Sequence, residues 1–125
     1  MKFQDNMPIY QQIEKYLYRQ IALGYFKPGD KIPSVRQLAV DLTVNINTVQ
    51  HALMRLNERK ILYVKRGQGN FVTEDTELLA QTRKELIDDQ IKQFTSNMLA
   101  LRLSPQQTLE ALRKYYEEKN EKGGD

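Results

Sequence analysis

The fold is decided by residues 33–56, PSVRQLAVDLTVNINTVQHALMRL, which predict two short helices joined by a tight turn. Ser34 is a suitable N-cap and Gln37 follows at capping-box spacing, so the first helix should start at residue 35. After a break over 43–45, the expected N-cap of the second helix is Asn47, with Gln50 in the reciprocal position. Apolar residues recur at helical spacing in both segments: Val35, Leu38, Ala39 and Leu42, then Val49, Ala52, Leu53 and Leu56.

Polar residues remain on the exposed first turns of the second helix: Asn45, Asn47, Thr48, Gln50 and His51. Short side chains with donors and acceptors are the kind that contact base edges in a DNA major groove. The same residues also suit an ordinary solvated helix face, because helix-turn-helix patterns arise by chance. DNA recognition is therefore a hypothesis that needs support from the rest of the chain.

A β-hairpin is predicted directly after the second helix, which we expect to run to about Lys60. Two β-rich segments, 62–65 and 70–73, flank a glycine-containing turn made of Arg66, Gly67, Gln68 and Gly69. In a winged helix, such a hairpin packs beside the second helix and its tip reaches the adjacent minor groove or backbone. Glycine allows a close approach, and Arg66 matches the negative potential of the groove. Any solvent-exposed turn has a similar composition, so the tip is informative only through its position after a helix-turn-helix.

An amphipathic helix is expected ahead of this unit, opening at Met7 and Pro8 and ending near Gly24. Its apolar stripe consists of Ile9, Ile13, Tyr16, Leu17, Gln20 and Ile21. A turn at 28–30 and a short extended piece at 31–32 then lead to Pro33.

A long amphipathic helix is predicted from about residue 76, and a second helix follows Ser104, Pro105 and Gln107, which form another capping box. Two helices alone are marginally stable, so their apolar face either folds back on the N-terminal part or meets its copy in a second chain. We expect a homodimer, which would place two reading helices about one DNA turn apart on a palindromic operator. The candidate dimerisation residues are Leu86, Ile87, Ile91, Phe94, Met98, Leu101, Leu109, Leu112 and Tyr116.

The charge differs between the N-terminal and C-terminal parts of the chain, as expected if the two parts have different roles. Residues 1–73 hold 11 Lys and Arg against 5 Asp and Glu, whereas residues 74–125 hold 8 against 11. A basic region is the expected footprint of a phosphate-binding surface, although small domains also vary by several charges. We therefore expect a mainly α fold with a small β-hairpin: a winged helix-turn-helix domain over 1–73, then a helical dimerisation region over 74–125 whose tail is disordered from about residue 119.

The composition argues against several other classes. The chain is 40% hydrophobic and 28% charged, as in ordinary globular proteins. It has no apolar run near the roughly 20 residues that span a bilayer, no signal-peptide core and no cysteine, so we expect a cytoplasmic protein. An enzyme is not expected, because His51 is the single histidine and no carboxylates converge in a recognisable spacing. No cofactor or metal is expected either.

With these elements in place, the chain resembles GntR-family transcription regulators over about residues 8–73. The resemblance rests on PIYQQIEKYLYRQIALGYFKPGDKIPSVRQLA at 8–39 and on the motifs (I/L)PS-x-R-x-LA, NTV-x-x-AL-x-x-L and G-x-G-x-(F/Y)V. The short two-helix C-terminal region is similar to the YtrA-like branch. Most other branches carry a larger effector-binding or aminotransferase-like domain, for which this chain has no room.

The resemblance implies roles for individual residues. Ser34 and Arg36 correspond to positions that touch phosphate and base edges at the start of the helix over 35–42. Ile46 stands where the family usually has an arginine, which removes a contact worth on the order of 1–3 kcal/mol of discrimination if it is made to guanine. An isoleucine can instead press on a thymine methyl, and the Gln50 amide can pair with adenine. The candidate DNA-contacting residues are Ser34, Arg36, Asn45, Ile46, Asn47, Thr48, Gln50, His51, Arg66, Gly67, Gln68 and Gly69.

The sequence thus predicts a sequence-specific DNA-binding transcriptional regulator. Repression is expected, because a small dimer on a promoter blocks polymerase without an activating surface, and the resemblance suggests control of a transporter operon. The alternative is a winged-helix protein-interaction module without specific DNA binding. No effector is identified; the only apolar place large enough is the dimer interface near Phe94, Met98, Leu112 and Tyr116, a stripe that more often is core.

Overall fold

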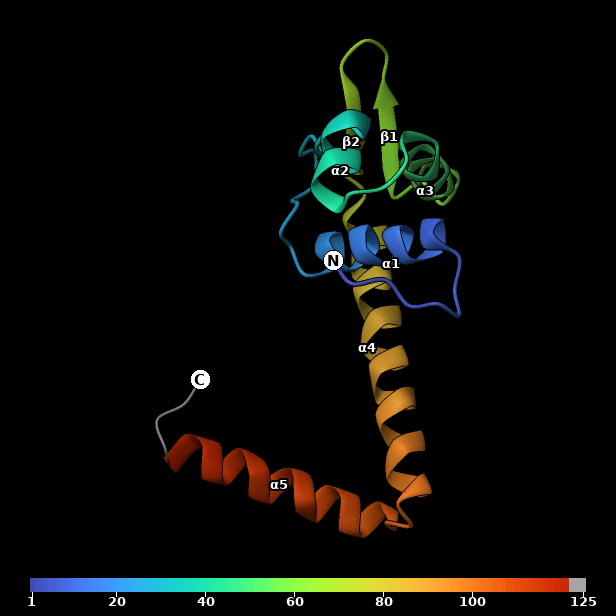
Figure 1. Cartoon of the computed structure of the whole chain (residues 1–125). Coiled ribbons are helices and arrows are strands. Elements are labelled where there is room, and N and C mark those ends of the chain that lie inside the picture. The colour runs from blue at the N-terminus through green and yellow to red at the C-terminus, as the bar shows by residue number, and fades with distance from the viewer. Residues whose placement is uncertain (122–125) are drawn as a thin grey trace. The chain divides into compact units, whose positions relative to one another are not determined.

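The computed structural model describes residues 1–121, and the chain divides into two compact units. The first is Met1–Leu86, and the second is Ile87–Asp125, of which residues 87–121 are described. The elements in order are α1 (Ile9–Ala22), α2 (Val35–Leu42), α3 (Ile46–Glu58), β1 (Leu62–Lys65), β2 (Gly69–Val72), α4 (Thr76–Ala100) and α5 (Pro105–Glu121) (Figure 1). This confirms the predicted mainly helical fold with one small hairpin and two C-terminal helices.

The core of the first unit joins α1, α2, α3 and the strands. Ile13 and Leu17 of α1 lie one helical turn apart and are buried, as their spacing predicts. All four apolar residues predicted for α3 are buried as well. The full cluster is Ile13, Leu17, Ile21, Ile32, Leu38, Ala39, Val49, Ala52, Leu53, Leu56, Ile61, Leu62 and Val72. Burial of this cluster fixes the helix-turn-helix on α1.

The turn between α2 and α3 is shorter than the sequence predicts. Thr43 adopts a left-handed conformation with φ 55° and ends α2, and α3 begins at Ile46. The N-cap is Asn45, whose Oδ1 accepts a hydrogen bond from the Asn47 backbone N–H at 2.7 Å. The prediction of Asn47 as N-cap is therefore wrong, because a single left-handed residue is enough to redirect the chain. The far end of α3 lies at Glu58, and Lys60 already has φ 64°.

The two predicted capping boxes differ in completeness. At α2, Ser34 Oγ accepts from the Gln37 N–H at 3.1 Å, but the Gln37 amide donates to Asp41 Oδ1 at 2.7 Å instead of accepting from Ser34. At α5 both halves form: the Ser104 N–H donates to Gln107 Oε1 at 2.8 Å, and the Gln107 N–H donates to Ser104 Oγ at 3.1 Å. Both caps start their helices at the predicted residues.

The hairpin is antiparallel, with Leu62 opposite Val72 and Lys65 opposite Gly69. Its free edge is extended by a bridge between Lys31 and Phe71, in the short extended piece predicted at 31–32. Gly67 at the tip has φ 76°, a conformation that favours glycine. In Figure 1 the tip projects past α2 and α3, and α1 lies at their other end.

The first turns of α4 belong to the first unit. Thr82 is 2% exposed, and its carbonyl oxygen accepts a hydrogen bond from the Tyr18 hydroxyl of α1 at 2.8 Å. The Tyr18 hydroxyl also lies 3.1 Å from Glu85 Oε2, and Leu79 packs against the core cluster. The division between the two compact units falls inside α4, after Leu86.

The second unit contains the rest of α4 and helix α5. Within Pro105–Glu121, all of which is described, no residue is buried. Helix α5 includes residues 119–121, for which the sequence predicts a disordered tail; the remainder of that tail, 122–125, lies outside the described residues. Across residues 1–121, no helix is both long and apolar enough to cross a membrane.

Candidate nucleic-acid interface

Helix α3 has one buried face and two edges that face solvent. Residues at helical spacing form each of the three. Val49 and Leu56 on the buried face are inaccessible. Asn47, Gln50 and Met54 follow at i, i+3 and i+7 along one edge, and all three are exposed. The opposite edge carries Thr48, His51 and Arg55, which are half-buried.

The edge with His51 faces α1. The His51 ring stacks on the Tyr10 ring with their centroids 3.8 Å apart and an interplanar angle of 15°. One turn further on, Arg55 Nε donates to Glu14 Oε1 at 2.6 Å, and this hydrogen bond raises the pKa of Arg55 above its ordinary value. The sequence places His51 on the exposed first turns of this helix and gives no sign of its stacking partner. The structure thus separates Thr48 and His51 from the edge that carries Asn47 and Gln50.

The edge with Gln50 faces the hairpin across a groove of about 350 Å³. Asn57 closes one end, because its Nδ2 donates to Asn70 Oδ1 at 2.9 Å and to the Leu53 carbonyl at 2.8 Å. The groove is lined by Val35, Gln50, Leu53, Met54, Asn57, Val64 and Asn70. Four of these lie outside the DNA-contacting set predicted from the sequence: Met54, Asn57, Val64 and Asn70. For Met54 a signal existed, since it continues the helical spacing of Asn47 and Gln50.

The start of α2 brings Ser34 and Arg36 to the surface of the same unit. The Ser34 Oγ is engaged as an N-cap acceptor, and its hydroxyl hydrogen remains free to donate. Arg36 is exposed in the first turn of α2. Unpaired backbone N–H groups give this end of a helix a partial positive charge, which favours phosphate. Arg36 adds a full charge to that end.

The beginning of α3 places three candidate residues together. Asn45 uses its side-chain oxygen as the cap, so its amide N–H₂ is the group left for another partner. Ile46 is the first helical residue and is 39% exposed. Asn47 follows and is exposed. An apolar side chain is therefore presented between two amides.

The hairpin tip carries cations around its glycines. Arg66, Gly67 and Gln68 are exposed, and the Gln68 N–H donates to the Lys65 carbonyl at 2.8 Å. Lys65 Nζ lies 4.4 Å from the Phe71 ring centroid, which holds that charge beside the strands. A Cβ built on Gly69 would lie 3.2 Å from Lys31 Cε, so Lys31 also belongs to the basic surface of the wing. Neither Lys31 nor Lys65 is among the DNA-contacting residues predicted from the sequence.

This geometry combines an exposed polar helix edge, a cationic hairpin tip and a basic helix start, as in a DNA-binding winged helix. In the described part of the chain, no three His, Cys, Asp or Glu residues gather into a possible metal site. The family model "Bacterial regulatory proteins, gntR family" matches residues 9–72, which is more than half of the chain. The chain belongs to the GntR family.

Relatives of this GntR-family chain include two Bacillus subtilis proteins. The HTH-type transcriptional regulator YhcF is 32% identical over 116 residues, covering 93% of this chain and 96% of YhcF. The HTH-type transcriptional repressor YtrA is 36% identical over 91 residues, covering 72% of this chain and 70% of YtrA. The resemblance to the YtrA-like branch is thereby confirmed.

Solved structures agree with this GntR assignment. A GntR family transcriptional regulator from Listeria monocytogenes superposes with a TM-score of 0.82 at 36% identity, covering 90% of this chain and 98% of that one. The DNA-binding domain of AraR, solved in complex with operator ORX1, superposes with a TM-score of 0.55 at 28% identity, covering 58% of this chain and 93% of that one. This GntR-family chain is therefore a winged helix-turn-helix transcription regulator of a family whose members bind duplex DNA.

Proposed function

We propose that this protein is a transcriptional repressor that binds a palindromic operator as a homodimer. Its DNA contacts are assigned to the start of α2, the Asn47–Gln50 edge of α3 and the hairpin tip. The observation that carries the proposal is the groove between α3 and the hairpin. The Gln50 amide lines it on the α3 side, and the hairpin on its other side leads to the cationic tip. This arrangement suits a helix inserted into a major groove beside a phosphate backbone.

The contacts fall into two classes by chemistry. Asn47 and Gln50 present amides that hydrogen-bond to base edges, with adenine as the natural partner of a bidentate amide. Arg36 and Arg66 are exposed cations suited to phosphate, which supplies affinity with little sequence information. Thr48 and His51 face α1, so we assign them to the rim of the interface, where a phosphate contact is the available role.

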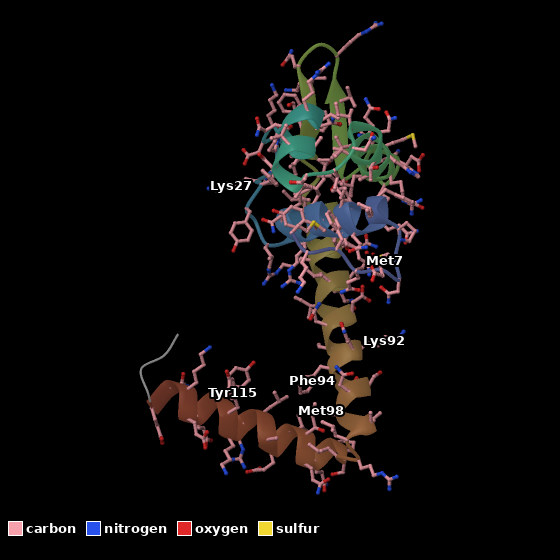
Figure 2. All side chains as sticks on the ribbon, in the orientation of Figure 1. Met7, Lys27, Lys92, Phe94, Met98 and Tyr115 are labelled. Carbon is pink, nitrogen blue, oxygen red and sulfur yellow. The ribbon has the colours of Figure 1, made fainter. Side chains whose placement is uncertain are left out.

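The homodimer is proposed from the apolar surface of the second unit. A cavity of about 460 Å³ is lined by Ile91, Phe94, Thr95, Leu99, Leu103, Pro105, Thr108, Leu109 and Leu112. Of the nine predicted dimerisation residues, Ile87, Ile91, Leu101, Leu109 and Tyr116 are exposed, and the other four are half-buried. Figure 2 shows Phe94 and Met98 on the part of α4 nearest to α5. Exposed apolar surface of this extent marks an interaction site, and a second copy of the chain is its proposed occupant.

We propose repression because of the small size of the two reading units in the proposed dimer. A dimer of two small reading units covers a promoter and blocks polymerase. The relative YtrA is described as a repressor, which supports this choice. Control of a transporter operon and a cytoplasmic location complete the proposal; no effector is assigned.

The salt dependence of DNA binding tests the proposed function. Binding of a labelled duplex to the full chain is measured by fluorescence anisotropy over a range of salt concentrations. Each neutralised phosphate contributes a slope of about −0.9 in log affinity against log salt, so the slope should be steep. Arg66→Ala should reduce its magnitude by about 1.

The control for this test is Lys92→Ala, which removes an equal charge from α4 in the second unit (Figure 2). It should leave the slope unchanged. A slope near zero for the unmodified protein would contradict the proposal. It would favour the alternative, a winged-helix module that binds other proteins.

A further inference from the structure

Met54 and Val64 place two apolar side chains at the edge of the proposed DNA interface. Met54 is 51% exposed and Val64 is 62% exposed, and both line the groove between α3 and the hairpin. Single exposed apolar residues are common and need no explanation. Met54 and Val64 come from different elements and line one groove together with Gln50 and Asn70, so their shared exposure needs an explanation.

The backbone directs both side chains to the same place. Met54 lies four residues after Gln50 and seven after Asn47, so it continues their edge by one helical turn. Val64 is two residues from Leu62, and alternate residues of a strand point to one face. Leu62 is buried in the core beside α3, so Val64 lies on that face further toward the tip.

The surroundings indicate what this apolar pair contacts. Arg66 lies two residues after Val64 at the hairpin tip, and Arg36 is the neighbour of Val35, which also lines the groove. Lys65 lies on the other face of the hairpin, over the Phe71 ring. Apolar and amide side chains with cations around them form a surface that suits a negatively charged partner carrying an apolar group between its charges. The DNA major groove matches this description, because its walls are phosphates and thymine presents a C5-methyl group there.

We propose that Met54, with Val64 beside it, recognises a thymine in each operator half-site through the thymine C5-methyl group. The proposal rests on the proposed function and adds an apolar specificity contact to it. Gln50 and Asn47 hydrogen-bond to bases nearer the start of α3, and Met54 selects thymine one turn further along the helix. Methionine suits this contact because its flexible thioether adapts to an irregular apolar surface.

The test uses deoxyuridine, which differs from thymidine only by the missing methyl group. The best palindrome selected from random duplex DNA is synthesised with each thymine replaced in turn, and affinities for the full chain are measured by anisotropy. At one thymine position of the half-site, replacement by deoxyuridine should weaken binding about fourfold. Replacement at that position in both half-sites should weaken it about fifteenfold, the effect expected for the loss of one buried methyl at each site. The thymine-to-uracil ratio is the affinity for the thymine duplex divided by the affinity for the deoxyuridine duplex. In Met54→Gln, which keeps the side-chain length and helical propensity, this ratio should fall to near one.

Matched variants make the assignment specific. Val64→Ala should reduce the ratio partly. Val40→Ala removes an even more exposed valine, at 72%, from α2; it does not line the groove, and its removal should leave the ratio unchanged. Circular dichroism confirms folding, which these surface substitutions should preserve.

Three outcomes would overturn the inference. If specific binding persists and no deoxyuridine weakens it, the thymine contact does not exist and the proposed function stands without it. If the ratio survives in Met54→Gln and Val64→Ala but disappears in Ile46→Ala, the methyl group is recognised by Ile46. If no duplex is selected and binding does not depend on salt, both the proposed function and this inference are contradicted.

Discussion

Glu14 of α1 accepts a hydrogen bond from Arg55 Nε of α3 across 2.6 Å, although Glu14 is only 7% exposed. Arg59 Nη1 lies 3.3 Å from the second oxygen of the same carboxylate. One acidic side chain therefore joins both the last turn of α3 and its C-cap residue, Arg59, to α1. The arginine side chains are about two-fifths exposed, so solvent screens their attraction, but the carboxylate depends on both of them for its hydrogen bonds.

Glu14→Gln should lower the thermal stability of the protein. The substitution removes the buried charge that both arginines share and leaves an amide whose N–H₂ faces two cationic donors. We expect the melting temperature to fall by several degrees, measured by circular dichroism. The control is Glu110→Gln, which breaks the exposed ion pair with Arg113 in α5 and should change the melting temperature little. Equal effects of the two variants would contradict a structural role for Glu14.

Stability should decrease at high pH through Tyr18. Burial raises the pKa of Tyr18 above its usual value of 10.0, and the hydrogen bond to Glu85 adds to the rise while Arg59 opposes it. Because the folded state holds this proton more tightly, the stabilisation is complete below about pH 10 and is lost as the pH rises through the folded-state pKa. Urea denaturation on both sides of this range should show a steeper loss for the unmodified protein than for Tyr18→Phe. Parallel curves would refute the assignment.

Arg36→Ala should weaken operator binding by roughly 1–3 kcal/mol without unfolding the protein. Arg36 is exposed at the start of α2, where helix dipole and guanidinium act together on a phosphate. Arg19→Ala removes a comparable exposed arginine from the last turn of α1 and serves as the matched control. Unchanged affinity in Arg36→Ala, with an intact circular dichroism spectrum, would remove this residue from the interface.

Ile91→Glu should convert the proposed dimer into a monomer. Ile91 lines the apolar cavity of the second unit and is exposed, so a carboxylate there would be buried without a partner in any dimer that covers it. Sedimentation velocity should show the mass fall to that of one 14.7 kDa chain at micromolar concentration. The neighbouring Lys92→Glu changes charge by more but does not line the cavity, and it should stay dimeric. A monomeric unmodified protein would contradict the dimer itself.

Local sequence rules predicted the elements well because each has a strong local signal. The buried stripe of α3 follows from helical spacing, the start of α5 from Ser104 and Gln107, and the hairpin from β-rich segments around a glycine turn. The N-cap of α3 was misassigned because Asn45 and Asn47 have the same capping chemistry. The extended backbone of Asn45 (φ −68°, ψ 141°) and its hydrogen bond from the Asn47 N–H distinguish the two in the structure.

The candidate site was less predictable, because helical period identifies an exposed edge but not the element beside it. Thr48 and His51 were grouped with Gln50 on exposure alone, yet Tyr10 of α1 stacks on His51. Val64 comes from a different element and meets Met54 only after the hairpin packs on α3. The division after Leu86 depends in the same way on tertiary contacts, here between Tyr18 and Thr82.

In the proposed complex, two copies of the α3 edge contact one duplex at symmetric positions. Selection of bound sequences from a random duplex pool, using the whole chain, measures this arrangement. We expect a palindrome whose half-site centres lie about 10 base pairs, or a whole multiple of one helical turn, apart. An enriched pool with a single unrepeated site, or no enrichment over the starting pool, would contradict it.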